Sequence, residues 1–303
     1  MRGAATVSRF ELFEAAAISG FTPSRREDAR RCAKMVSRAS AVSLISLATL
    51  GIVATPSRAR AADPFEIQVY DGTANDPGVA GLELHVNHVL RGVRAVEAPL
   101  LAPDRQTHFT LEPSLGITPF WELGAYFQTS LRGDGHFDYA GTKLRSKFVT
   151  PPAFSEHVRL GLNFELARIP ETFSEDAWGV ELRPIVAFEN ERWLLAANPI
   201  VSVSVAGCRA GCGGPEFEPA AAAYLKIPKV AAIGFEYYGS LGPLKKFSPR
   251  SAQVHYLFAA TNLLVFAGWE VNAAVGRGLT TLGGSSNEYV IKTILGHELG
   301  KSW

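Results

Sequence analysis

Polar and apolar residues alternate without interruption along residues 157–166. Because successive side chains of a β-strand point to opposite faces, this segment predicts a strand with one wholly apolar and one polar face. A soluble sheet turns the apolar face toward its core, whereas a membrane barrel turns it toward lipid and turns the polar face toward a lumen. The apolar positions are Val158, Leu160, Leu162, Phe164 and Leu166.

Similar alternation predicts about twelve strands after Phe65 and no convincing helix. Most of these segments reach the roughly nine to eleven residues that a tilted strand needs to cross a bilayer, whereas strands of soluble domains usually have about five or six. The expected strands are 81–90, 105–117, 121–131, 137–149, 157–168, 176–189, 192–206, 215–227, 230–240, 252–265, 268–278 and 288–299.

The connections between these segments alternate between long and short. Outer-membrane barrels have long external loops, short periplasmic turns and an even number of strands. We therefore predict an all-β protein whose residues 81–303 form an antiparallel, up-and-down transmembrane β-barrel of about twelve strands. The alternative is a soluble β protein. The long connections are near 91–104, 132–136, 169–175, 207–214, 241–251 and 279–287.

Four prolines fall inside the expected strands, where each removes a ladder donor and normally marks an edge or a bulge. A closed barrel has no edges, so we expect bulges at these positions. They are Pro113, Pro184, Pro199 and Pro219.

The start of the chain has the pattern of an export signal. A basic stretch around Met35 precedes a short apolar run at 41–54, and the small-x-small sequence Ala59-Arg60-Ala61 follows. This order is typical of a cleavable Sec signal peptide, and the run is too short to span a bilayer. We predict an N-terminal extension and signal peptide at 1–61, with its core at 35–61, and a short periplasmic segment at 62–80. An uncleaved membrane anchor is the alternative.

Composition narrows the choice of partners. The net charge of +1 gives no electrostatic footprint for nucleic acid, and no apolar run approaches the roughly 20 residues of a spanning helix. We expect the lipid of a Gram-negative outer membrane around the barrel, a small-molecule solute as the candidate ligand, no nucleic acid and no cofactor.

Charged residues recur in the middle of the strands, on the face opposite the apolar residues. On a barrel these positions face the lumen, where they predict either a charged conduit for a solute or an ion-pair network that fills the interior. The members are Glu112, Glu122, Lys143, Arg145, Lys147, Arg159, Glu165, Glu181, Arg183, Glu216, Glu218, Glu236 and Glu270, with Lys292 on the same face.

Catalytic and metal-binding signatures are sparse. Cys208 and Cys212 lie in a Gly-rich external loop and predict a local disulfide. His85 and His88 are three residues apart on a strand and therefore point to opposite faces, so they cannot share an ion. The sequence contains no zinc spacing, no Gly-x-Ser-x-Gly elbow and no His-x-Ser-Asn pattern of barrel phospholipases. We expect no enzymatic activity.

Four segments carry a resemblance to known proteins: 111–118, 121–124, 139–145 and 276–280. Together they resemble the outer-membrane family named for the meta-pathway of phenol degradation, generally described as putative transporters. The resemblance covers roughly 80–299 and implies a location and a fold. It transfers no binding residue to this chain.

Three functions are therefore open. The first is a porin-like channel or transporter for a small solute, with aromatic or otherwise apolar compounds among the candidates. The second is a structural or adhesive barrel that acts through its external loops. The third is a lipid-modifying barrel enzyme.

Overall fold

The structure is a computed structural model that describes residues 63–264, 268–279 and 287–299. The predicted extension and signal peptide lie outside these residues. Among the described residues, no helix is long and apolar enough to cross a membrane. Two single turns of 3₁₀ helix occur, η1 at Pro152–Phe154 and η2 at Arg250–Ala252.

Within the described residues, twelve long strands and the two-residue β10 form one sheet. The long strands match the predicted segments to within about two residues at every end, because the alternation that defines each segment persists to its ends. They are β1 Ala80–Arg91, β2 Thr107–Thr118, β3 Trp121–Leu131, β4 Phe137–Val149, β5 Val158–Arg168, β6 Asp176–Glu189, β7 Trp193–Cys208, β8 Glu216–Ile227, β9 Ala231–Ser240, β11 Val254–Leu263, β12 Trp269–Gly278 and β13 Tyr289–Leu299, and β10 is Gly242–Pro243.

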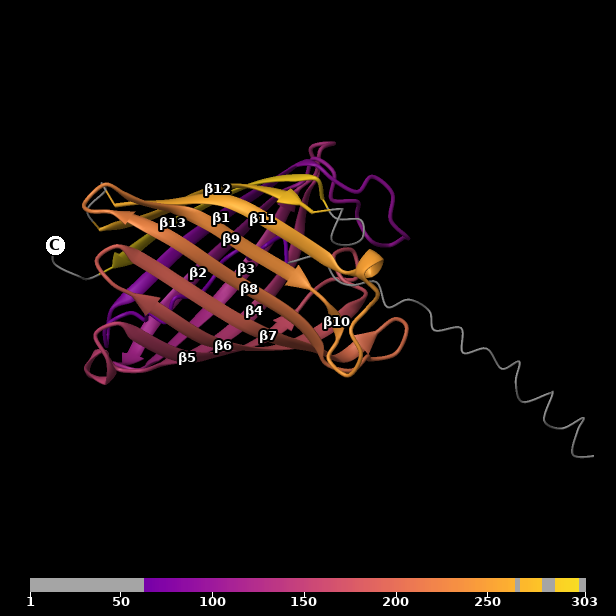
Figure 1. Cartoon of the computed structure of the whole chain (residues 1–303). Helices are drawn as coiled ribbons and strands as arrows, with labels where there is room; N and C mark the ends of the chain where they lie inside the picture. The colour runs from indigo at the N-terminus through magenta and orange to yellow at the C-terminus, as the bar shows by residue number, and fades with distance from the viewer. Residues whose placement is uncertain (1–62, 265–267, 280–286, 300–303) are drawn as a thin grey trace, which may run out of the picture. The chain divides into compact units, whose positions relative to one another are not determined.

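The sheet closes on itself with up-and-down topology. Each long strand pairs antiparallel with its neighbours in sequence, and β1 pairs with β13 from Ala80↔Leu299 to Arg91↔Tyr289. The long connections therefore lie at one end of the barrel, here called the loop end, together with β10 and η2 (Figure 1). The short connections lie at the opposite end, the turn end.

The wall is apolar outside and polar inside. On β5, Leu162 and Phe164 have exposed fractions of 41% and 43%, whereas Asn163 and Glu165 between them have 0% and 1%. This is the reverse of a soluble protein, in which large apolar side chains are buried and charges are exposed. The apolar face of 157–166 therefore faces lipid, and its polar face lines the lumen.

Pro113, Pro184 and Pro199 interrupt the ladder without shifting it, so the bulges predicted there are wrong. At Pro219 the pairing does shift by one residue, from Ala220↔Tyr238 to Phe217↔Gly242. On either side of Pro184 and Pro199, Leu182 pairs with Val201 and Val186 pairs with Ala197, in one continuous register. The wall lacks paired residues there because proline has no N–H to donate. The register shift between β6 and β7 lies elsewhere, between Trp178 and Gly179.

The lumen has two chemically different halves. Most of its buried charges come from β1–β6, among them His85, Arg145 and Arg183. The half formed mainly by β7–β13 contains a buried apolar cluster instead. Its wall residues are Val89, Ile200, Ala220, Ala222, Tyr224, Ala232, Tyr238, Val254, Tyr256, Phe258, Ala260, Ala274 and Val290.

The chain before β1 runs through this lumen from end to end. Near the loop end, the Pro64 carbonyl accepts a hydrogen bond from Asn87 on β1. At the turn end, the Gly78 amide donates to the Gly116 carbonyl on β2. The stretch Asp63–Val79, here called the lumen segment, therefore lies inside the wall for most of its length. The sequence predicts that residues 62–80 form a periplasmic segment. The lumen segment instead lies inside the barrel, where its charges and hydrogen-bonding groups contact the wall.

Candidate functional site

The lumen segment alternates like a strand between the two halves of the lumen. Ile67 belongs to the apolar cluster, and Val69 packs against it. The residues between and beside them contact the charged half: Glu66 pairs with Lys143, and Gln68 donates to Glu83 at 3.2 Å. Each face of the segment thus matches the half of the lumen that it covers.

Glu66 anchors the segment at the centre of the charged half. Its carboxylate is buried and lies 2.9 Å from Lys143 Nζ and 3.0 Å from Arg183 Nη2. Lys143 Nζ also lies 3.4 Å from Glu165, and Arg183 Nε lies 2.7 Å from Glu181. Because a buried charge is tolerated only when it is paired, these two cations hold the Glu66 carboxylate in place inside the barrel.

Tyr70 forms the second anchor. Asn198 on β7 both donates to the Tyr70 carbonyl and accepts from the Tyr70 amide. The Tyr70 hydroxyl hydrogen-bonds to that of Tyr126. The Arg183 guanidinium lies 4.4 Å from the Tyr70 ring centroid, within the range of a cation–π contact.

A second ion-pair cluster lies nearer the turn end. Arg145 bridges Glu112 and Glu122 at 2.6 Å each, and Lys147 lies 2.9 Å from Glu122. The other oxygen of Glu122 accepts a hydrogen bond from the Asn75 amide of the lumen segment. This cluster therefore also fixes the segment.

The remaining predicted network residues fall into separate groups. Arg159 pairs with Asp71 of the lumen segment and with Glu189, and Lys292 pairs with Glu236. Glu218 accepts a hydrogen bond from Ser202, and Glu216 lies on the same face of β8. Glu270 lines a lumen cavity at the turn end. The charges thus form local clusters rather than one continuous ladder.

Two cavities open beside the lumen segment in the turn-end half of the barrel. One has a volume of about 380 Å³ and touches both halves of the lumen, from Glu112 and Arg145 to Ala222 and Ile294. The other, about 300 Å³, lies between Asn75 and the first residues of β1. Tyr70 lines the first of these cavities, and Glu66 is buried beside it.

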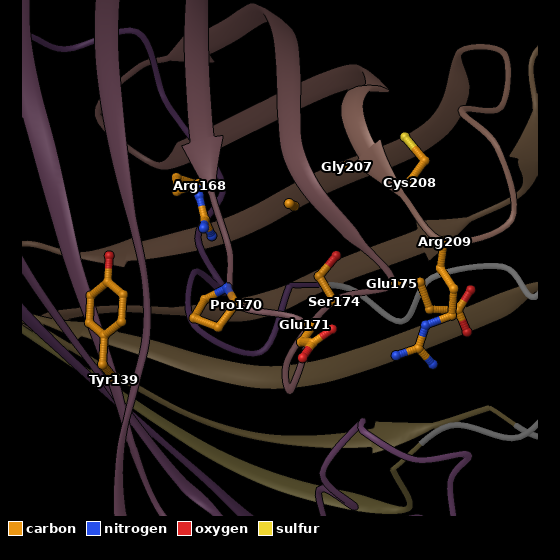
Figure 2. Close-up of a pocket in the computed structure, with 10 residues that line it drawn as sticks. Tyr139, Arg168, Pro170, Glu171, Ser174, Glu175, Gly207, Cys208 and Arg209 are labelled. Carbon is orange, nitrogen blue, oxygen red and sulfur yellow. The ribbon is translucent and has the colours of Figure 1, made fainter.

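A third hollow of about 830 Å³ lies at the loop end (Figure 2). Arg168, Glu171 and Arg209 line it, from the end of β5 and from two loops. Its rim includes Cys208, which forms a disulfide with Cys212. This is the pair that the sequence indicates.

Sequence reasoning missed several lumen residues. Glu66, Tyr70 and Asp71 precede the predicted barrel, and only the short alternation at 65–70 pointed to an extended segment. Glu83 and His85 lie on the inward face of β1, in phase with Asn87. Their i, i+2 spacing on a predicted strand was the available signal.

A closed ring of bilayer-length strands with an apolar exterior and a charged interior defines a transmembrane β-barrel. The protein is therefore a barrel of the bacterial outer membrane, as the sequence predicts.

No protein-family model matches the sequence, and no curated protein matches it significantly. Among solved structures, a KdgM porin aligns over 72% of this chain and 98% of its own, with 10% identity and a TM-score of 0.47. The COG4313 outer membrane channel from Pseudomonas putida F1 aligns over 77% and 100%, with 10% identity and a TM-score of 0.49. LpxR from Salmonella typhimurium aligns over 72% and 99%, with 8% identity and a TM-score of 0.41.

With TM-scores below 0.5, these likenesses carry no conclusion about what the chain binds or whether it is an enzyme. Membership of the meta-pathway phenol-degradation family stays a prediction.

Proposed function

We propose that the protein is an outer-membrane channel for a small apolar or aromatic solute, and that the lumen segment closes it. The observation that carries this proposal is the two-sided lumen. A pore for small ions has no use for an extended apolar surface, whereas β7–β13 present an apolar cluster on their side of the lumen, beside the ion pair of Glu236 with Lys292. Ile67 and Val69 cover that surface in the closed state.

The larger of the two turn-end cavities gives the solute an entry from the turn end. Its volume of about 380 Å³ lies within the range of about 300–1,000 Å³ of small-molecule sites. Its apolar wall includes Ala222 and Leu194, and Tyr224 on the same wall supplies an aromatic ring with a hydroxyl. The resemblance of the sequence to proteins of aromatic degradation is consistent with such a solute.

Passage requires the lumen segment to move. It is held through ion pairs and hydrogen bonds rather than through strand pairing with the wall, so it can shift without opening the barrel. The contacts to break are those of Glu66 with Lys143 and Arg183, and those of Tyr70 with Asn198.

The test is uptake of a radiolabelled monoaromatic compound by cells that have this barrel as their only channel for it. Intact outer membranes are needed because apolar solutes cross a phospholipid bilayer unaided. Ala222→Phe fills the apolar side of the cavity and is expected to lower the uptake rate severalfold. Ala223→Phe, one residue along, places the same ring on the exposed outer face and is expected to leave uptake unchanged.

Both variants must shift on heating in a detergent gel, which shows that they folded. Equal uptake by cells with and without the barrel would contradict a channel and favour the adhesive alternative. Phospholipid hydrolysis by the purified protein would favour the enzyme instead. A larger effect of Ala223→Phe than of Ala222→Phe would place the solute path outside the lumen.

A further inference from the structure

Three carboxylates lie in a row across the lumen face near the turn end. Glu83 on β1 pairs in register with Glu112 on β2 and with Gly296 on β13, and Gly296 pairs in turn with Glu270 on β12. Since Gly296 has no side chain, Glu83 and Glu270 both extend over it: a Cβ at Gly296 would lie 3.2 Å from Glu83 Cγ and 3.2 Å from Glu270 Cβ. The glycine allows two acids to lie closer together than a residue of ordinary size would permit.

His85 lies two residues beyond Glu83 on the same face, and its side chain is fully buried. Its Nε2 atom lies 3.4 Å from Glu83 Oε2 and 3.3 Å from Glu112 Oε2. Among the described residues, neither ring nitrogen makes a hydrogen bond of good geometry, nor does Glu112 Oε2. A buried imidazole nitrogen and a buried carboxylate oxygen thus point into one small space.

The two separations from His85 Nε2 match those of ligands around one metal ion, and the three ligand atoms all lie within 4.8 Å of one another. Two N or O atoms bound about 2.0–2.2 Å from a tetrahedral Zn²⁺ lie about 3.3–3.5 Å apart. We propose that Glu83, His85 and Glu112 bind a divalent cation of the zinc class. One imidazole and two carboxylates are three ligands of the kinds that bind Zn²⁺, and they leave a fourth position open to water.

The excess of carboxylates around the site favours the binding of a cation. Five carboxylates lie in this region, those of Glu83, Glu112, Glu122, Glu270 and Glu298, against the two cations Arg145 and Lys147. The other charged residues around the cavity balance one another: Asp71 and Glu189 with Arg159 and Lys226, and Glu236 with Lys292.

Neighbouring groups hold two of the ligands in place. Arg145 Nη2 lies 2.6 Å from Glu112 Oε1, the oxygen that faces away from His85. Gln68 Nε2 of the lumen segment donates to Glu83 Oε2. Such partners fix the orientation of metal-binding carboxylates. Glu83 and Glu112 line the larger cavity, which gives an ion a route from the turn end.

The experiment is a Zn²⁺ titration of the full-length protein, folded in detergent, stripped with a chelator and free of a polyhistidine tag. We expect one Zn²⁺ per wild-type chain by calorimetry and by metal analysis after dialysis. His85→Gln is expected to weaken binding by at least about tenfold, since even changes in outer-shell partners cost about 10–100-fold. His88→Gln is the matched control, because it changes the same residue type on the lipid-facing side of the same strand.

Co²⁺ provides a second measurement. Its visible absorption should report a tetrahedral site in the wild-type protein and in His88→Gln, and should be lost in His85→Gln. If His85→Gln fails to fold, Glu83→Gln tests the same site at a ligand that is only half-buried. No Zn²⁺ binding by the wild type, or equal binding by wild type and ligand variants, would overturn the proposal.

Discussion

The side chain of Asn198 holds the backbone of Tyr70 in both directions. Its Nδ2 donates to the Tyr70 carbonyl at 2.9 Å, and its Oδ1 accepts from the Tyr70 amide at 2.7 Å. One wall residue thereby supplies both bonds that a neighbouring strand would offer. Asn198 lies within the ladder interruption around Pro199, between the paired residues Ala197 and Val201. It joins the lumen segment to the wall at the junction of the charged and apolar halves.

Asn198→Ala is expected to loosen the lumen segment without unfolding the barrel. The substitution leaves a buried N–H and a buried C=O unpaired, which costs about 1–3 kcal/mol. Hydrogen exchange should therefore become faster at Tyr70 and its neighbours while the wall strands keep their protection. Ion conductance in planar bilayers should rise, because the segment would leave its closed position more often.

Asn163→Ala is the matched control for this change. Asn163 is also a fully buried lumen asparagine, but its side chain donates to Glu165 of the wall. We expect it to leave exchange at Tyr70 unchanged. Equal effects of the two variants would show that Asn198 acts on the wall and not on the segment.

Glu66→Gln should destabilise the lumen segment more strongly. The change removes the negative charge shared by Lys143 and Arg183 inside the barrel. Breaking a buried ion pair by removing one partner costs about 3–5 kcal/mol, and the contacts of Lys143 with Asp63 and Glu165 place the effect at the lower end. Protease sensitivity of the segment in the folded barrel is the measurement. Glu171→Gln, on an exposed loop, should change nothing.

Leu162→Arg should impair insertion of the barrel. Leu162 lies in the middle of β5 on the lipid face, where arginine costs about 2–4 kcal/mol at the bilayer midplane. Urea titration of folding into lipid vesicles measures the loss. Leu162→Met conserves the volume and should cost less than about 1.5 kcal/mol. Normal insertion of the arginine variant would show that β5 turns its other face to lipid.

The disulfide at the loop end should contribute modestly to stability. It joins two cysteines that are 4 positions apart in the sequence. So short a loop loses little chain entropy in the unfolded state, which corresponds to a stabilisation on the order of 2 kcal/mol. The double variant Cys208→Ser, Cys212→Ser should therefore fold and still shift on heating. Thiol labelling before and after reduction measures the bond itself; labelling of both cysteines without reductant would contradict it.

The wall could be predicted from the sequence because lipid and lumen impose opposite requirements on adjacent residues. Leu162 and Asn163 show this most clearly, and the same contrast located the ends of all twelve long strands to within about two residues. β11 shows where the signal fails. Tyr256 and Phe258 face the lumen while Leu257 faces lipid, so both faces are apolar and the pattern cannot say which is inside.

Such patterns could not predict where the lumen segment lies. Glu66 and Lys143 are separated by 77 residues, and a six-residue alternation does not indicate what it packs against. Three of the four prolines, Pro113, Pro184 and Pro199, were misjudged for a related reason. The sequence shows that a proline has no N–H to donate to the ladder. Whether the strand register shifts there depends on how the residues on either side are paired.

The course of the lumen segment also determines how the protein can be labelled. Asp63 precedes Pro64, whose carbonyl accepts from Asn87 toward the loop end, whereas Leu299 pairs with Ala80 at the turn end. A fluorophore attached at Asp63 and another attached at Leu299 would lie toward opposite ends of the barrel. The two labels would then report on the two compartments that the membrane separates, and their accessibility in intact cells would give the orientation of the chain.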